Sequence, residues 1–450
     1  MTLRRPLLPD LRAVLILGLP LAGSHLAQFA LAVTDTIMLG WYGVTDLAAS
    51  VIGAALYFAF FTFGLGFANA VMPMVAAAAA NGQETEVRRA TRMGLWLSLI
   101  YAALVVPLFW FSAPLLTALG QPPEVVPLAQ DYLRLMGLAL PFALIVAVLK
   151  SYLAALGRTQ MTLAVTVAAV FLNIALNWVL IFGNLGFPEL GVTGAALASI
   201  LVQVATVLGL GIYCAWLPDL RRFTLFQRFW RPDWQAMGQV WRLGWPIGVA
   251  MIAETGLFSA AAVMMGWIGT LELAAHGIAL EVTAMLFMVH MGFSNAATVL
   301  VGRGWGIGDR VAMRAYARAT IFVSMTFAAC TILLYVSAAA QIVGVFLSPA
   351  DPLRDQIIVI GASFLLIAAV FQLADGAQVV AMGLLRGVQD TRVPMIIAAV
   401  SYWGVGLPAS YALAFPLGFG GEGLWAGLVI GLSVAACLLM WRFWRGPGRA

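Results

Sequence analysis

Cysteine, histidine and charged residues are scarce in this chain. Its 450 residues include three cysteines and three histidines, and only 10% of the residues are charged. The cysteines lie inside apolar runs without CxxC spacing, which argues against both a disulfide framework and a metal site. HExxH, GxSxG and phosphate-loop motifs are also missing. We therefore expect neither an enzyme nor a protein with a bound cofactor.

The apolar residues are too numerous for a soluble core. They make up 63% of the chain, which is typical of a membrane protein. The net charge of +5 comes from arginines spread between apolar runs rather than gathered on one soluble face. No nucleic-acid partner is expected, and the arginines are interpreted as topology signals for a chain embedded in the lipid bilayer.

Apolar windows of about 20 residues, the length that crosses a bilayer, recur along the whole chain. They predict an all-α membrane protein with twelve transmembrane helices. The windows are 13–38, 47–75, 93–113, 130–153, 160–182, 191–215, 241–266, 272–300, 316–338, 356–384, 394–415 and 422–443.

The basic residues between these windows fall on one side of the predicted membrane. All of them except Arg134 and Arg354 lie in the termini or in alternate loops. Because basic residues collect on the cytoplasmic side, this distribution predicts cytoplasmic termini and an even number of spans.

Residues 18–92 align with residues 244–318 without a gap, which indicates a duplicated unit. Each half holds six predicted spans, so the halves enter the membrane from the same side as parallel repeats. We expect an N-lobe at 1–217, a cytoplasmic interfacial linker at 218–239 and a C-lobe at 240–450. The identical pairs include Pro20 with Pro246, Gly40 with Gly266, Asn69 with Asn295, and Arg88 with Arg314.

Four acidic residues fall inside predicted spans: Asp35, Glu254, Glu281 and Asp375. Each costs about 2.5–3.5 kcal/mol near the centre of a membrane helix, so such residues usually face a hydrated cavity or an ion path. Another interpretation is a protonated acid that hydrogen-bonds two helices together. For Glu281 the two interpretations stay open.

The second half holds more of these acids. Glu254, Asp375 and Glu281 are candidates for an oxygen site for Na⁺ or for a proton carrier, and both hypotheses use the same residues. Asp35 of the first half is a further candidate for cation coupling, because one acid per half would make a shared cavity attractive to cations. Phe258, one turn after Glu254, offers a ring either to a cation or to packing.

In the first half, Gln28 aligns with Glu254 and lies seven residues before Asp35, on the same helix face. Asn173 and Asn177 have i, i+4 spacing on the fifth span and are candidates to hydrogen-bond Asp35. These residues form a candidate polar substrate site, with polar contacts between helices as the competing account.

Several stretches together resemble the MATE (multidrug and toxic compound extrusion) family, NorM-type branch, over nearly the whole chain. They are Pro20…Gln28…Thr34-Asp35-Thr36…Gly40, Leu273-Ala-Ala-His276-x-Ile-Ala-Leu280, Asn173-Ile-x-x-Asn177…Phe182-Gly183 and Leu385-Arg-Gly387…Asp390-Thr391-Arg392.

The resemblance implies two six-helix lobes around a central cavity and an antiporter of the bacterial cytoplasmic membrane. Small organic cations would leave while Na⁺ or H⁺ enters, by alternating access and as a monomer. Asp35 matches the family's N-lobe polar site, and Glu254 with Asp375 matches its C-lobe acidic pair. Glu281 departs from the neutral residue expected there.

The alternative is a lipid-linked sugar flippase of the same broad superfamily. That activity demands basic residues to hold pyrophosphate. In the first half only Lys150 and Arg134 lie near span ends, which favours the antiporter.

Overall fold

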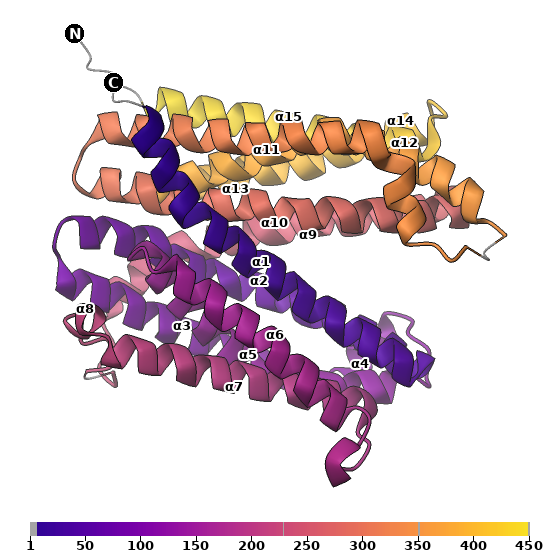
Figure 1. Ribbon diagram of the computed structural model, residues 1–450, viewed down its shortest axis with the longest axis horizontal. Coiled ribbons are helices and arrows are strands. Elements are labelled where there is room, and N and C mark those ends of the chain that lie inside the picture. Colours follow the sequence, from indigo (N-terminus) through magenta and orange to yellow (C-terminus); the bar gives the residue numbers. More distant parts are fainter. Residues whose placement is uncertain (1–6, 228, 350–351, 449–450) are drawn as a thin grey trace. The chain divides into compact units, whose positions relative to one another are not determined.

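The computed structural model describes residues 7–227, 229–349 and 352–448, and these residues contain helices but no strand. Twelve of the helical segments are long and apolar enough to cross a membrane, which confirms the predicted fold class (Figure 1). The long helices are α1 (Leu7–Tyr42), α2 (Val44–Ala80), α3 (Glu84–Trp110), α5 (Val126–Ala155), α6 (Thr159–Leu180), α7 (Gly191–Trp216), α9 (Trp234–Ile268), α10 (Thr270–Gly306), α11 (Arg310–Val345), α12 (Arg354–Gly387) and α15 (Gly420–Arg445).

The remaining span is composite. It joins α13 (Arg392–Ala399), the π-helix η2 (Val400–Gly406) and α14 (Leu407–Ala414). Short helices lie outside the spans: α4 (Ala113–Ala118), the 3₁₀ turn η1 (Asn184–Gly186) and α8 (Pro218–Arg221).

The helices pack into two compact units. One consists of Gly23–Gly248, and the other of Met1–Ala22 together with Val249–Ala450. These units differ from the lobes expected from the sequence, because α1 and α9 each contribute their first part to one unit and their remainder to the other.

The duplication extends to the helix ends and to the packing of the shared helices. Tyr42 and Ile268, the last residues of α1 and α9, are aligned positions of the two repeats. A Cβ atom on Gly18 would lie 2.7 Å from a ring carbon of Phe293, and one on the aligned Gly244 would lie 2.6 Å from the aligned Phe67. The start of α1 therefore packs on α10 as the start of α9 packs on α2.

Small residues bring α10 and α12 together in the unit that contains the C-terminal half. A Cβ atom on Gly383 would lie 2.4 Å from the carbonyl oxygen of Ser294. The Ser294 hydroxyl donates to the Val379 carbonyl at 2.6 Å, and the Thr298 hydroxyl donates to the Gly383 carbonyl at 2.9 Å. Such close backbone approach is typical of packed membrane helices. It determines which face of α12 packs on α10, and Asp375 lies on that face, one turn before Val379.

In the Gly23–Gly248 unit, α1 packs along α6. The hydroxyls of Ser24 and Thr166 hydrogen-bond at 2.9 Å, and a Cβ atom on Gly23 would lie 3.0 Å from the side chain of Leu163. These contacts set the register of the two helices and position the polar residues that lie farther along each of them.

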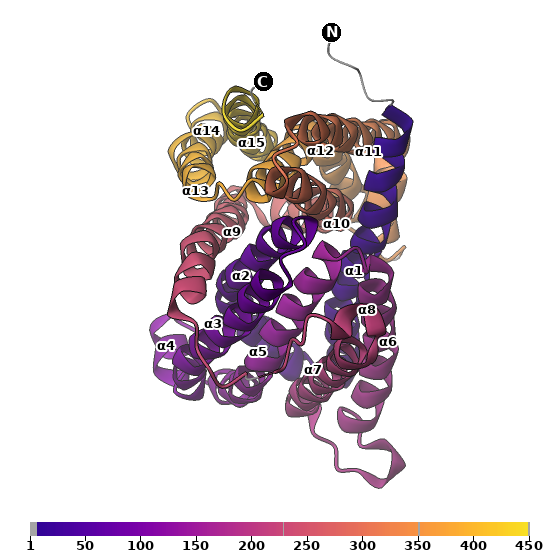
Figure 2. The same ribbon diagram turned by 90° about the vertical axis from the view of Figure 1, so that its left-hand side faces the viewer.

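The predicted linker, residues 218–239, begins with α8, and its final part already belongs to α9. Between the two helices the chain passes the N-terminal half of α3 (Figure 2). There Trp96 donates its indole N–H to the Phe229 carbonyl at 2.9 Å. The rings of Trp96 and Phe229 also stack, with centroids 5.8 Å apart.

Candidate functional site

Asp35 on α1 contacts two asparagines of α6. The Asn177 amide donates to the Asp35 carboxylate at 2.6 Å and to the Asn173 side-chain oxygen at 3.2 Å. Both asparagines are fully buried. Nδ2 of Asn173 and Oδ1 of Asn177 have no hydrogen-bond partner among the described residues. A buried donor and a buried acceptor beside a carboxylate form a site that is able to hold a polar ligand.

Aromatic hydroxyls lie close to this cluster. Tyr132 of α5 is 7% exposed and interacts electrostatically with Asp35 and with Tyr57 of α2. Sequence patterns missed both tyrosines, because only the tertiary packing of α2 and α5 brings them to α1. Gln28 lies exposed on α1, two turns before Asp35.

The acids of the C-terminal half meet on α9 and α12. Glu254 and Asp375 interact electrostatically with each other, and Tyr402 interacts with both. Asp375 is only 2% exposed. Gln378, one turn after Asp375 on α12, donates its amide N–H to the Tyr402 hydroxyl at 2.5 Å. The result is a cluster of two carboxylates, one amide and one phenol, in which Glu254 is half-buried and the other three side chains are buried.

Three oxygens of this cluster are buried without a hydrogen-bond partner among the described residues: Glu254 Oε1, Asp375 Oδ1 and Gln378 Oε1. Carboxylate and amide oxygens suit hard cations such as Na⁺. In the described part of the chain no group of three or more His, Cys, Asp or Glu side chains is placed to hold a metal. Any cation held here would therefore rely on amide or hydroxyl oxygens besides the two acids.

The π-helix η2 orients this cluster. Trp403 donates its indole N–H to the Ala253 carbonyl at 3.0 Å, directly before Glu254 in α9. A Cβ atom on Gly256 would lie 2.8 Å from the Trp403 ring, so glycine is needed there for the indole to fit. Short π segments inside helices are frequent at functional sites. Here the widened turn carries Tyr402 and Trp403 side by side.

A basic residue that was not a candidate from the sequence lies near the acids, and the remaining candidates lie elsewhere. Arg386, in the last turn of α12, is 8% exposed and interacts electrostatically with Glu254. Glu281 is exposed on α10 and has no side-chain hydrogen bond to the described residues. Phe258 packs edge-on against Phe371, with ring centroids 6.0 Å apart.

Comparison with known families identifies the chain. The model of the family described as MatE matches residues 20–179 and 246–412. The chain belongs to the MatE family. This membership confirms the resemblance seen in the sequence, and the two matched segments correspond to the two repeats.

Relatives of this MatE protein match it over almost its full length. "Probable multidrug resistance protein NorM" of Rhizobium meliloti (strain 1021) is 45% identical over 437 residues, which cover 96% of this chain and 93% of the relative. The protein of the same name from Agrobacterium fabrum (strain C58 / ATCC 33970) is 41% identical, with the same two coverages, 96% and 93%.

Solved structures share the fold of this MatE protein. The crystal structure of MATE in complex with MaL6 superimposes with a TM-score of 0.87 at 20% sequence identity, covering 97% of this chain and 96% of that one. An outward-facing multidrug resistance MATE family transporter of the MOP superfamily gives a TM-score of 0.86 at 20% identity, with coverages of 97% and 96%. At this identity the likeness shows the fold alone.

Proposed function

We propose that this MatE protein is a secondary active antiporter that exports cationic amphiphilic drugs and toxins in exchange for Na⁺ or H⁺. It works by alternating access, as a monomer with both termini in the cytoplasm of a bacterial cell. The family and the names of its relatives support an exporter. The observation that carries the proposal is the cluster of Glu254 and Asp375, a half-buried acid and a buried acid on two membrane-spanning helices.

The coupling ion binds at this cluster. A charged carboxylate in a membrane helix is costly, and either a bound Na⁺ or a proton neutralises it. Both acids have an unpartnered buried oxygen to offer, and Tyr402 and Gln378 supply a hydroxyl and an amide beside them. Loading and unloading of the ion thus changes the charge of the C-terminal unit by the amount a cationic substrate would carry.

Asp35 with Asn173 and Asn177 forms a second polar site that recognises the organic cation. The carboxylate supplies charge, and the unpartnered amide groups supply a donor and an acceptor. One site per unit allows the ion and the drug to bind to separate carboxylates.

Transport by everted membrane vesicles tests the proposal. Ethidium uptake is measured under an imposed Na⁺ gradient and, in a separate experiment, under an imposed pH gradient. Glu254→Gln and Asp375→Asn should abolish the response to whichever gradient drives the wild-type protein. Undiminished uptake by both variants, or no uptake by the wild-type protein under either gradient, would reject the antiporter.

A further inference from the structure

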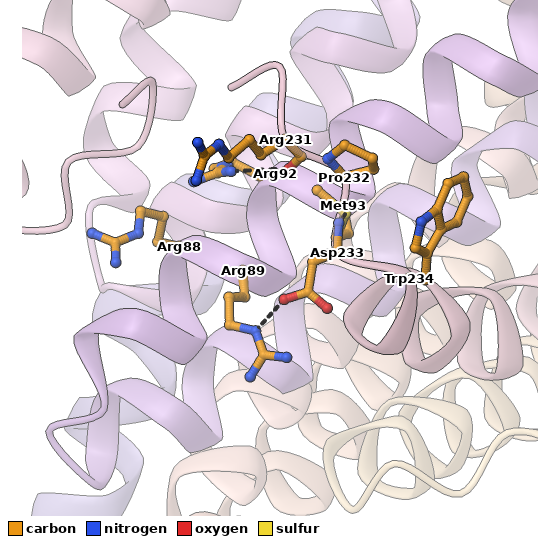
Figure 3. A pocket seen from close by; sticks show the side chains of 8 residues that line it. All are labelled: Arg88, Arg89, Arg92, Met93, Arg231, Pro232, Asp233 and Trp234. Carbon is orange, nitrogen blue, oxygen red and sulfur yellow. Dashed lines mark hydrogen bonds and ion pairs between the residues drawn. The ribbon is translucent and has the colours of Figure 1, made fainter. Parts of the chain in front are cut away.

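A basic pocket lies where the linker crosses the start of α3, within the Gly23–Gly248 unit (Figure 3). Its volume is about 420 Å³, and four arginines and one aspartate are its only charged residues. It is lined by Arg88, Arg89, Arg92 and Met93 of α3, by Arg231, Pro232 and Asp233 of the linker, and by Trp234 at the start of α9.

Two of these arginines are fixed by the linker itself. Arg89 donates through Nε to the Asp233 carboxylate at 2.5 Å. Arg92 donates to the carbonyl oxygens of Gln227 and Arg231, at 3.0 and 3.2 Å. These contacts hold the linker segment that carries Arg231 against α3 before any ligand arrives, which reduces the entropic cost of binding.

The pocket keeps an excess of positive charge. Glu86 and Asp233 both pair with Arg89. Arg88 donates to the neutral hydroxyl of Thr224 at 2.5 Å. Among the described residues, neither Arg88 nor Arg231 forms an ion pair with a carboxylate. These two arginines are available to an anion, and guanidinium groups favour phosphate because they match it with paired N–H donors.

An apolar groove of about 340 Å³ lies mainly between α5 and α7, and α3 and the linker contribute one residue each, Leu95 and Phe226. It is lined by Leu95, Ile145, Leu149, Val207, Leu208, Gly211, Ile212, Ala215, Trp216 and Phe226. Arg88, Arg92 and Leu95 have i, i+4, i+7 spacing and share one face of α3. Along that face of α3, Arg88 and Arg92 come before the apolar part of the helix, and Leu95, which lines the groove, lies within the apolar part.

Exposed tryptophans indicate that the pocket and the groove lie at the depth of the membrane interface. Trp230 and Trp234 of the linker region are 72% and 73% exposed, and Trp216 at the end of α7 is 80% exposed. Indole rings concentrate at the depth of lipid headgroups. A charged pocket at that depth, followed by an apolar groove, matches an amphiphile with an anionic head and an acyl chain.

We propose that this pocket binds the phosphate of an anionic phospholipid, with one acyl chain in the groove. Arg88 and Arg231 contact the phosphate, while Arg89 and Arg92 hold the linker over α3. The proposal does not depend on what the protein transports. It assigns to the linker a role as a lipid-binding element between the two repeats.

Native mass spectrometry of the purified full-length protein in detergent tests this site with dioleoyl phosphatidylglycerol and dioleoyl phosphatidylcholine as probes. The wild-type protein should retain phosphatidylglycerol preferentially. Arg88→Gln and Arg231→Gln should each weaken its binding by about fivefold, as expected for loss of one basic residue near a lipid surface. Arg221→Gln is the matched control, because Arg221 is exposed on the same linker but does not line the pocket.

A second pair of measurements separates the lipid from a free anion. Gly211→Trp fills the groove, where a Cβ atom meets nothing within 4 Å, and should weaken phosphatidylglycerol binding without changing the melting temperature. Tight binding of inorganic phosphate together with no effect of Gly211→Trp would overturn the lipid assignment. Equal losses in Arg221→Gln and Arg231→Gln, or no preference for phosphatidylglycerol in the wild-type protein, would overturn the site itself.

Discussion

Asn177 donates a hydrogen bond to Asp35 at 2.6 Å, and this contact follows from the register of α1 and α6. Ser24 and Thr166 hydrogen-bond earlier on the same two helices. Counting along the sequence, Asp35 follows Ser24 by the same number of residues as Asn177 follows Thr166. The two helices therefore run parallel, and each presents a polar residue to the other at both levels.

Asn177→Ala should impair transport far more than Ser24→Ala. The first change leaves the Asp35 carboxylate without its short hydrogen bond, which costs about 1–3 kcal/mol for a buried group. We expect efflux to fall by about tenfold, the factor that corresponds to about 1.4 kcal/mol. Efflux of ethidium from cells with matched expression measures both variants. Equal activity of the two would show that Asn177 serves only to join the helices.

Glu254→Gln and Asp375→Asn should be non-additive. If the two acids share one coupling ion, losing either removes the site, so the double variant should be no worse than the more impaired single one. Gradient-driven uptake into vesicles gives the three rates. Independent losses that multiply in the double variant would place the acids in separate sites.

Tyr402→Phe should weaken coupling without unfolding the protein. The substitution removes the hydroxyl that accepts the Gln378 N–H and keeps the ring. Tyr411→Phe is the control, because Tyr411 is 51% exposed on α14 and its hydroxyl has no partner in the described residues. A rise in the Na⁺ or H⁺ concentration needed for half-maximal transport is expected only for Tyr402→Phe. Identical ion dependence in both variants would exclude Tyr402 from the site.

The packing of α1 on α10 predicts a sharp difference between two glycines of α10. A Cβ atom on Gly292 would lie 2.4 Å from the backbone nitrogen of Ala22, whereas one on Gly277 meets nothing within 4 Å. Gly292→Ala should lower the melting temperature, since overpacking costs about 1–3 kcal/mol. Gly277→Ala should keep or raise it, because alanine favours a helix by up to about 1 kcal/mol. Thermal unfolding in detergent compares them, and a melting temperature unchanged in Gly292→Ala would contradict the close crossing.

The attachment of the linker to α3 should resist mild acid. The Arg89 guanidinium, which donates to Asp233, holds the pKa of that carboxyl below its ordinary value. The ion pair therefore contributes its full stability above about pH 3.9, the ordinary aspartate pKa. It is lost only as the pH falls through the lowered value in the folded protein. Hydrogen exchange of the linker should stay slow at pH 5, and Asp233→Asn should exchange faster at pH 5 and pH 7 alike. Rapid exchange of the wild-type linker at pH 5 would contradict this.

Hydropathy predicts the twelve spans well because a bilayer demands long apolar helices. It places the ends of several helices too far inside, so the helices are longer than the apolar windows. The window expected at 13–38 belongs to a helix that extends from Leu7 to Tyr42, since helices continue into the interface without an apolar sequence. The π-helix η2 has no periodic signal, and it is set by tertiary contacts such as that of Trp403 with α9.

The candidate site was only partly predictable. Intramembrane acids stand out in the sequence because their cost is high, so Asp35, Glu254 and Asp375 are found without a structure. The residues that surround these acids carry no such cost, so nothing in the sequence distinguishes them from other polar or aromatic residues. Gln378 lies one turn after Asp375 on α12, whereas Tyr402 reaches the acids only through the fold, which brings its hydroxyl to the Gln378 amide.

The sharing of α1 and α9 between the units has a consequence for separate expression of the two halves. Each repeat places the start of its first helix in the unit formed mainly by the other repeat, with aligned residues at both crossings. The first half made alone would therefore leave the start of α1 without its packing surface on α10, and the second half made alone would leave the start of α9 without α2. The two halves are expected to reach their native packing only when both are present.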